Sequence, residues 1–136
     1  MIHLSSKKYK AVLIVLHFLF VLQCPLWGDS QNTQLIVTPG TDFIASSCDI
    51  VLQNTDIINN GTFDASKADV AFTGSSSDTI SGNDSALIKV FTVNKTGGAF
   101  TRLNTDVHVN NRVDFIGGLI QLNGKTLLLT DSAFLN

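Results

Sequence analysis

The stretch LNTDVHVNNRVDFIGGLIQLNGKTLLL, from Leu103 to Leu129, decides the fold of this chain. It holds four short segments in which apolar and polar residues alternate. Their apolar residues are Val107/Val109, Val113/Phe115, Ile120/Leu122 and Leu127/Leu129, and the segments are separated at Asn110-Asn111, Gly117-Gly118 and Asn123-Gly124. Side chains alternate between the faces of a strand, so each segment can bury one side. Asn and Gly tolerate positive φ angles. The pattern predicts an all-β coil or sandwich with very short loops.

The chain before this stretch follows the same pattern. Short apolar segments lie between turn residues, and no segment after residue 28 has a helical periodicity of 3.6. The segment LIKVFTV, residues 87–93, is apolar on both parities, which predicts a strand covered on both sides or one with a twist. The residues that we expect to face the core are Ile57, Phe63, Val70, Phe72, Ile80, Val107, Val109, Val113, Phe115, Ile120, Leu122, Leu127 and Leu129. The residues expected to shape the corners are Asn60, Gly61, Gly74, Gly118 and Gly124.

An internal repeat underlies this pattern. Asn54-Thr55-Asp56-Ile57 recurs as Asn104-Thr105-Asp106-Val107, at an offset of 50 in the numbering (104 − 54). The same offset maps Val70 onto Ile120, Phe72 onto Leu122 and Gly74 onto Gly124. Periods of about 20–50 residues are typical of solenoids. A unit of this size predicts two coils of about 25 residues each, stacked so that equivalent side chains form ladders.

The run from Asn59 to Leu129 resembles the repeats of bacterial secreted, adhesin-like β-solenoid proteins of the Bacteroidetes type. The motifs that carry this resemblance are NNGTFDA (59–65), VAFTG (70–74), ISG (80–82), FTVNKTGG (91–98), DVHV (106–109) and GLIQLNGKTLLL (118–129). We therefore predict a right-handed parallel β-helix of about four short coils, with a small β-sandwich as the alternative. Proteins of this kind run to several hundred residues, so we expect the solenoid domain, 29–136, to be incomplete at its C-terminus.

Residues 1–28 have the parts of a secretory signal. Lys7, Lys8 and Lys10 precede an apolar run from Ala11 to Leu22, and the small residue Gly28 precedes a polar stretch. The run is short for a membrane anchor, which needs about 20 apolar residues. We expect a signal helix that is cleaved after Gly28, leaving a secreted or cell-surface protein without a stable membrane span. The alternatives are a retained anchor and lipidation at Cys24, although Gln23 stands where a lipidation site has a small residue.

The composition of residues 29–136 argues against nucleic acid as a partner. Six basic residues remain against eleven acidic ones, a net charge of −5 (6 − 11), and all eleven are Asp. Without a basic patch, we expect no nucleic acid partner.

Cys48 has no second cysteine in this part of the chain, so it cannot form an internal disulfide. We expect a small buried residue beside Ile50, with a reactive thiol or intermolecular pairing as the alternative.

One row of polar residues is a candidate ligand-facing surface. Asn104, Asp106, His108 and Asn110 share one parity and would line one face of a strand. Carboxylate, imidazole and amide groups could hold a metal or a sugar, whereas a solvated face or an Asn ladder is the simpler interpretation. Calcium would suit an Asp-rich exported chain, but neither the loop with a distal Glu nor the glycine-rich calcium nonapeptide is present. We predict no catalytic, cofactor-binding or metal-binding residue.

These observations favour a non-catalytic exported segment with a structural or adhesive role. Its partners would be surface glycans or other cell-surface proteins. A small carbohydrate-binding β module is the alternative, but Tyr9 and Trp27 would leave with the signal and only Phe would remain as an aromatic platform. A fragment of a polysaccharide-active enzyme is the least favoured class, because few coils fit in this length and no catalytic motif is present.

Overall fold

The computed structural model describes residues 32–130 and 132–136, and every regular element within them is a β-strand. The all-β prediction is thus confirmed for these residues, whereas the predicted signal, residues 1–28, and Cys24 lie outside them. The strands are β1 (Thr33–Val37), β2 (Asp42–Gln53), β3 (Thr55–Asn59), β4 (Thr62–Gly74), β5 (Asp78–Gly82), β6 (Ala86–Lys95), β7 (Phe100–Leu103), β8 (Val107–Gly117), β9 (Leu119–Gln121), β10 (Leu127–Leu129) and β11 (Phe134–Leu135). Among the described residues, no long apolar helix suited to crossing a membrane is found.

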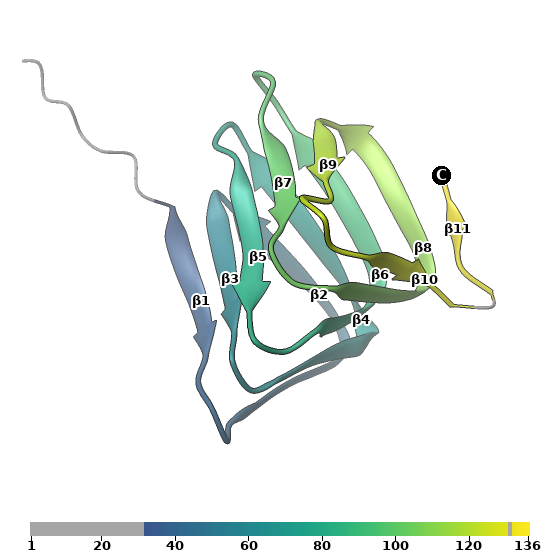
Figure 1. The fold of residues 1–136 in the computed structure, drawn as a ribbon. Coiled ribbons are helices and arrows are strands. Elements are labelled where there is room, and N and C mark those ends of the chain that lie inside the picture. Colours follow the sequence, from purple (N-terminus) through teal and green to yellow (C-terminus); the bar gives the residue numbers. More distant parts are fainter. Residues whose placement is uncertain (1–31, 131) are drawn as a thin grey trace, which may run out of the picture. The chain divides into compact units, whose positions relative to one another are not determined.

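The strands are divided between two sheets that the chain visits in alternation (Figure 1). One sheet has the order β1-β3-β5-β7-β9 and the other β10-β8-β6-β4-β2, with β11 also paired to β8. All of these pairings are parallel. The chain is therefore a β-solenoid of about five turns, one more than predicted, and the β-sandwich alternative is wrong. We number the turns 1 (β1–β2), 2 (β3–β4), 3 (β5–β6), 4 (β7–β8) and 5 (β9–β11).

The long strands bend once, so that each covers two sides of the coil while a short strand covers the third. The bend coincides with a shift of pairing register between Ala65 and Asp69 in β4, and between Ile88 and Val90 in β6. Val90 and Phe91 are consecutive and both buried, because the bend changes the parity that faces inward. Because of this bend, residues 87–93 are apolar on both parities. The bend agrees with one of the two explanations predicted for this segment, a strand with a twist.

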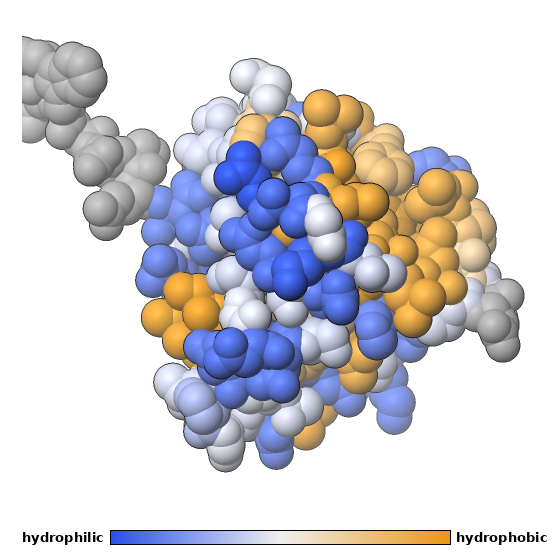
Figure 2. All heavy atoms as spheres, viewed as in Figure 1, coloured by the Kyte–Doolittle hydropathy of each residue, from blue (hydrophilic) through white to orange (hydrophobic). Residues whose placement is uncertain are grey.

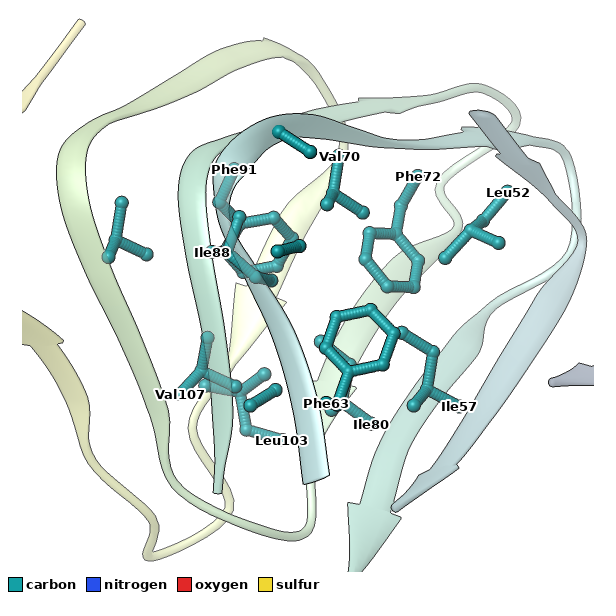
Figure 3. Packing of buried hydrophobic residues seen from close by; sticks show 14 of the residues in the cluster. Leu52, Ile57, Phe63, Val70, Phe72, Ile80, Ile88, Phe91, Leu103 and Val107 are labelled. Atoms are coloured by element: carbon teal, nitrogen blue, oxygen red, sulfur yellow. The ribbon is translucent and has the colours of Figure 1, made fainter. Parts of the chain in front are cut away.

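Inward side chains from successive turns stack in ladders, and three of these ladders represent the three sides of the coil. The ladders are Leu35–Ile57–Ile80–Leu103 on the short strands, Phe43–Phe63–Ala86–Val107–Leu127 before the bend, and Ile50–Val70–Phe91–Val113–Leu135 after it. Figure 3 shows Phe63, Phe72 and Phe91 pointing into the interior that the strands enclose. Phe72 and Phe91 meet edge to face with their ring centroids 5.5 Å apart, a favourable aromatic geometry.

The predicted core is confirmed in turns 2 and 3 and in most of turn 4. The expected residues that are buried there are Ile57, Phe63, Val70, Phe72, Ile80, Val107, Val109 and Val113. Ile120, Leu127 and Leu129 are partly buried against this cluster. Phe115 and Leu122 were expected in the core but are 45% and 46% exposed. Phe115 pairs with buried Val93 and continues an inward ladder, but no side chain of turn 5 covers it fully.

The predicted size of the coils is close to the observed one, but the alignment of Asn54 with Asn104 is wrong, because two turns bring Leu103, and not Val107, into register with Ile57. Ile57 pairs with Ile80, and Ile80 pairs with Leu103, which makes each step between turns about half of the expected offset. Asn54 precedes the first residue of β3, whereas Asn104 follows the last residue of β7. The two asparagines therefore occupy opposite ends of one side of the coil. The match thus joins the start of β3 to the corner between β7 and β8, which are different parts of the coil.

Two details of the corners are also settled. Gly61 is required at its predicted corner, since a Cβ there would lie 2.5 Å from the carbonyl oxygens of Thr38 and Thr41. Cys48 was expected to be buried and is exposed. It follows Ser47, whose φ is +56°, in a part of β2 where the pairing register shifts. This irregular backbone turns the thiol away from the core.

Candidate functional site

The polar row of turn 4 points outward and follows the coil around its corners. Asn104 and His108 are half-buried, whereas Asp106 and Asn110 are exposed. Asn104 and Asp106 lie between β7 and β8, while His108 and Asn110 lie within β8. The structure thus places the four residues on successive parts of one turn rather than around a common point.

Three members of the row make contacts between turns. Asn123 donates a hydrogen bond to Asn104 Oδ1 at 2.7 Å, and the Thr126 backbone N–H donates to Asp106 Oδ1 at 2.8 Å. Asn110 donates to the Ser66 carbonyl oxygen at 3.0 Å. A group that already satisfies a backbone partner is less free to bind a ligand.

Polar residues at the corners of turn 2 also make contacts with another turn. Asn54 Oδ1 accepts a hydrogen bond from the Ser76 N–H at 3.0 Å, Asp56 Oδ1 from the Thr79 N–H at 2.7 Å, and Asn60 Oδ1 from the Asn83 N–H at 3.1 Å. Each acceptor therefore clips the backbone of the next turn. The Asn and Asp side chains at the corners therefore accept hydrogen bonds from backbone N–H groups that have no partner in the β-sheets.

His108 has apolar neighbours on its outward ladder. Its register partners are Leu87 in turn 3 and Leu128 in turn 5. Among residues 32–130 and 132–136, no group of three or more His, Cys, Asp or Glu side chains is arranged to hold a metal ion.

The strongest polar feature of the interior is a buried ion pair between Asp78 and Lys95. Asp78 begins β5 and Lys95 ends β6, so both belong to turn 3. Asp78 has the inward parity of Ile80, and Lys95 has that of Val93. The Lys95 Nζ contacts Asp78 Oδ2, and both side chains are completely buried.

Hydrogen bonds hold both ends of this pair. Lys95 Nζ donates to the carbonyl oxygens of Thr73 at 2.6 Å and Ser76 at 3.0 Å. Asn32 Nδ2 donates to Asp78 Oδ1 at 3.3 Å. Within the described residues, Asp78 Oδ2 has no partner besides Lys95, and the buried hydroxyl of Thr101, the register partner of Asp78 on turn 4, has none.

Burial raises the pKa of the Asp78 carboxyl above its ordinary value, while the hydrogen bond and the positive charge of Lys95 act in the opposite direction. Two charges removed from water cost several kcal/mol each before their attraction is counted. The pair is therefore costly to bury unless its two groups compensate each other.

The sequence did not point to this pair. Asp78 follows three serines and Lys95 precedes Thr96-Gly97-Gly98, so both stand beside residues typical of loops. The sequence does contain one indication. Asp78 stands two residues before Ile80 and Lys95 stands two residues after Val93, so each charged side chain shares a strand face with an apolar residue. A charged residue in phase with a buried strand face predicts a buried charge, but its partner follows only from the stacking of the turns.

Large exposed apolar side chains gather at the ends of the solenoid. Three lie in turn 1 (Ile36, Ile44 and Val51), and seven lie between residues 115 and 135 (Phe115, Ile116, Leu119, Leu122, Leu128, Phe134 and Leu135). None of those identified lies in turns 2 and 3. Figure 2 shows apolar side chains gathered where Figure 1 draws β8 and β9. Isolated exposed apolar residues are ordinary, but a contiguous group marks an interaction surface.

The fold defines the class of this protein as a parallel β-solenoid. No family model, curated protein or solved structure matches the chain.

Proposed function

We propose that this protein is an exported, non-catalytic β-solenoid with a structural or adhesive role at the cell surface or outside the cell. The observation that carries the proposal is the distribution of exposed apolar side chains, which gather at the two ends of the coil and not along turns 2 and 3. A solenoid whose large exposed apolar side chains lie in its terminal turns is suited to contact through those turns.

The ladders supply the geometry for a second copy of this chain at the end of turn 5. Phe43 and Leu127 are the two ends of one ladder, and both are partly buried. If turn 1 of another copy continued the stack, its Phe43 would lie against Leu127. The same step that joins successive turns would then join two molecules.

Charge favours this head-to-tail arrangement. Turn 1 contains Asp42 and Asp49 and no basic residue, whereas Lys125 lies just before β10 in turn 5. Continuing the ladder would bring Lys125 of one copy close to Asp42 of the next. Such a contact joins two different surfaces, so it generates open-ended chains rather than closed dimers.

The location and the partners rest on the sequence. The signal-like residues 1–28 and the resemblance to bacterial adhesin-like solenoids support export to the cell surface. Glycans or other surface proteins could bind the polar sides, where Asn104, Asp106, His108 and Asn110 face outward. Protease treatment of intact cells tests this location, because a surface protein is digested without lysis.

Sedimentation velocity tests the structural role. The wild-type protein should form a series of species that grows with concentration, and Leu127→Asp should abolish it. Thr92→Asp, a matched charge on the outward side of turn 3, should leave it unchanged. A monomer at every concentration would overturn end-to-end association, and growth that stops at a dimer would indicate tail-to-tail contact instead.

The other two function classes have their own readouts. Binding to a glycan array that is lost on His108→Ala would favour a carbohydrate-binding module. Turnover of an acidic polysaccharide by the purified protein would contradict the non-catalytic assignment.

A further inference from the structure

Lys95 Nζ lies against the carboxyl group of Asp78, and backbone carbonyl groups hold it there. A neutral amine has two N–H bonds and one lone pair. The carbonyl oxygens of Thr73 and Ser76 accept hydrogen bonds from Lys95 Nζ, which accounts for two N–H groups. The remaining direction of Nζ is occupied by the Asp78 carboxyl group. The third direction of Nζ therefore faces Oδ2 of Asp78, which is bonded to the carboxyl carbon Cγ.

We propose that Lys95 and Asp78 react to form an intramolecular isopeptide bond that covalently closes turn 3. In this step the Nζ lone pair attacks Cγ of Asp78, and a new Nζ–Cγ bond forms. The Cγ–Oδ2 bond then breaks, and Oδ2 leaves as water with two protons that began on the ammonium group. An ammonium and a carboxylate thus become one neutral amide and one water molecule, without an oxidant or any other co-reactant.

The surroundings favour each part of this reaction. Both side chains are completely buried, and burial raises the pKa of Asp78. A desolvated lysine is an effective nucleophile. Asn32 Nδ2 donates to Oδ1, the atom on which negative charge develops during attack, so it can stabilise the intermediate. Holding the two groups in contact replaces a bimolecular encounter by an intramolecular one.

The bond would have a structural consequence. It would tie the first residue of β5 to the last residue of β6, across the whole of turn 3. A covalent link of this kind limits the freedom of the unfolded chain, as a disulfide does. The link needs no second cysteine, and the proposal is independent of how the molecules associate.

Peptide mapping of the full-length protein by mass spectrometry tests this proposal. Trypsin should release one branched peptide in which residues 68–89 are joined to residues 90–102, with the combined mass of the two segments less one water molecule. Fragmentation should place the link between Asp78 and Lys95. Trypsin should not cleave after Lys95, since its amine is blocked.

The chain contains its own control. Lys89 and Asp69 also form an ion pair, with Nζ and Oδ1 3.0 Å apart, but both side chains are substantially exposed. They should remain unlinked, so trypsin should cleave after Lys89. Lys95→Arg should yield separate, unmodified peptides. Release of unmodified peptide 90–95 from the folded wild-type protein, with no loss of water, would overturn the proposal even if the variant fails to fold.

Discussion

The rings of Phe43 and Phe63 stack nearly parallel across turns 1 and 2, with their centroids 4.9 Å apart and their planes inclined by 8°. This pair begins the ladder that continues through Ala86 and Val107 to Leu127. Because each rung is buried only by the rungs on either side, the same side chain should matter more in the middle of the ladder than at its ends.

Phe63→Ala should therefore destabilise the protein strongly. Phe63 is 1% exposed, and removing a buried phenyl group costs about 3–5 kcal/mol. Phe115→Ala is the matched control at the open end, where the side chain is 45% exposed and about 1 kcal/mol is expected. Denaturant unfolding measures both changes. Equal losses would contradict the position of Phe115 at an uncovered rung.

Val109→Asp should unfold the coil, whereas the neighbouring His108→Ala should do little. Val109 is completely buried and His108 points outward. An unpaired charge in the core costs about 4 kcal/mol or more, while a surface change costs about 0.5 kcal/mol or less. Thermal unfolding of the two variants checks the assignment of faces, and similar shifts in Tm would be evidence against it.

Asn59→Ala should destabilise the corner between turns 2 and 3. Asn59 is completely buried, its Nδ2 donates to the carbonyl oxygens of Asp84 and Ser85, and its Oδ1 accepts from the Gly61 N–H. Leaving such buried groups unpaired costs about 1–3 kcal/mol each. Asn59→Asp retains the acceptor but loses both donors, so it should also destabilise. A variant Asn59→Asp as stable as the wild type would disprove the role of the two donated bonds.

Acid should weaken the contact of turn 4 with β11. Burial opposes the shift, but hydrogen bonds from Arg112 and Asn136 together lower the pKa of Asp114. A carboxyl whose pKa is lowered by folding stabilises the protein above its unfolded value of about 3.9, and this stabilisation is lost as the pH falls through the folded value. The difference in stability between wild type and Asp114→Asn should be about 0.2–1 kcal/mol at neutral pH. It should vanish at low pH, and an undiminished difference there would rule out this linkage.

The sequence predicted what depends on local alternation. Val107 and Val109 alternate with polar residues, and that parity is kept in the coil. Phe115 and Leu122 fit the local pattern of residues that face inward, but no further turn covers them. Whether a residue is covered depends on its position along the stack and not on the local pattern.

The stacking of the turns could not be predicted from the sequence, because the corner loops differ in length. The step from Phe43 to Phe63 is therefore shorter than the next step of the same ladder, from Phe63 to Ala86. No single offset describes such a chain. Asp78 and Lys95 stand at opposite ends of turn 3, and only the closure of that turn brings them together.

Disulfide trapping between two copies tests the end-to-end stack most directly. In a background with Cys24 and Cys48 replaced by Ser, one copy carries Phe43→Cys and the other Leu127→Cys. Adjacent strands lie about 4.8 Å apart, within the range of Cα separations that a disulfide spans. We predict a cross-linked heterodimer from this mixture and none from Phe43→Cys mixed with Thr92→Cys. Failure of the first mixture to cross-link, or cross-linking of Leu127→Cys only with itself, would contradict the head-to-tail arrangement.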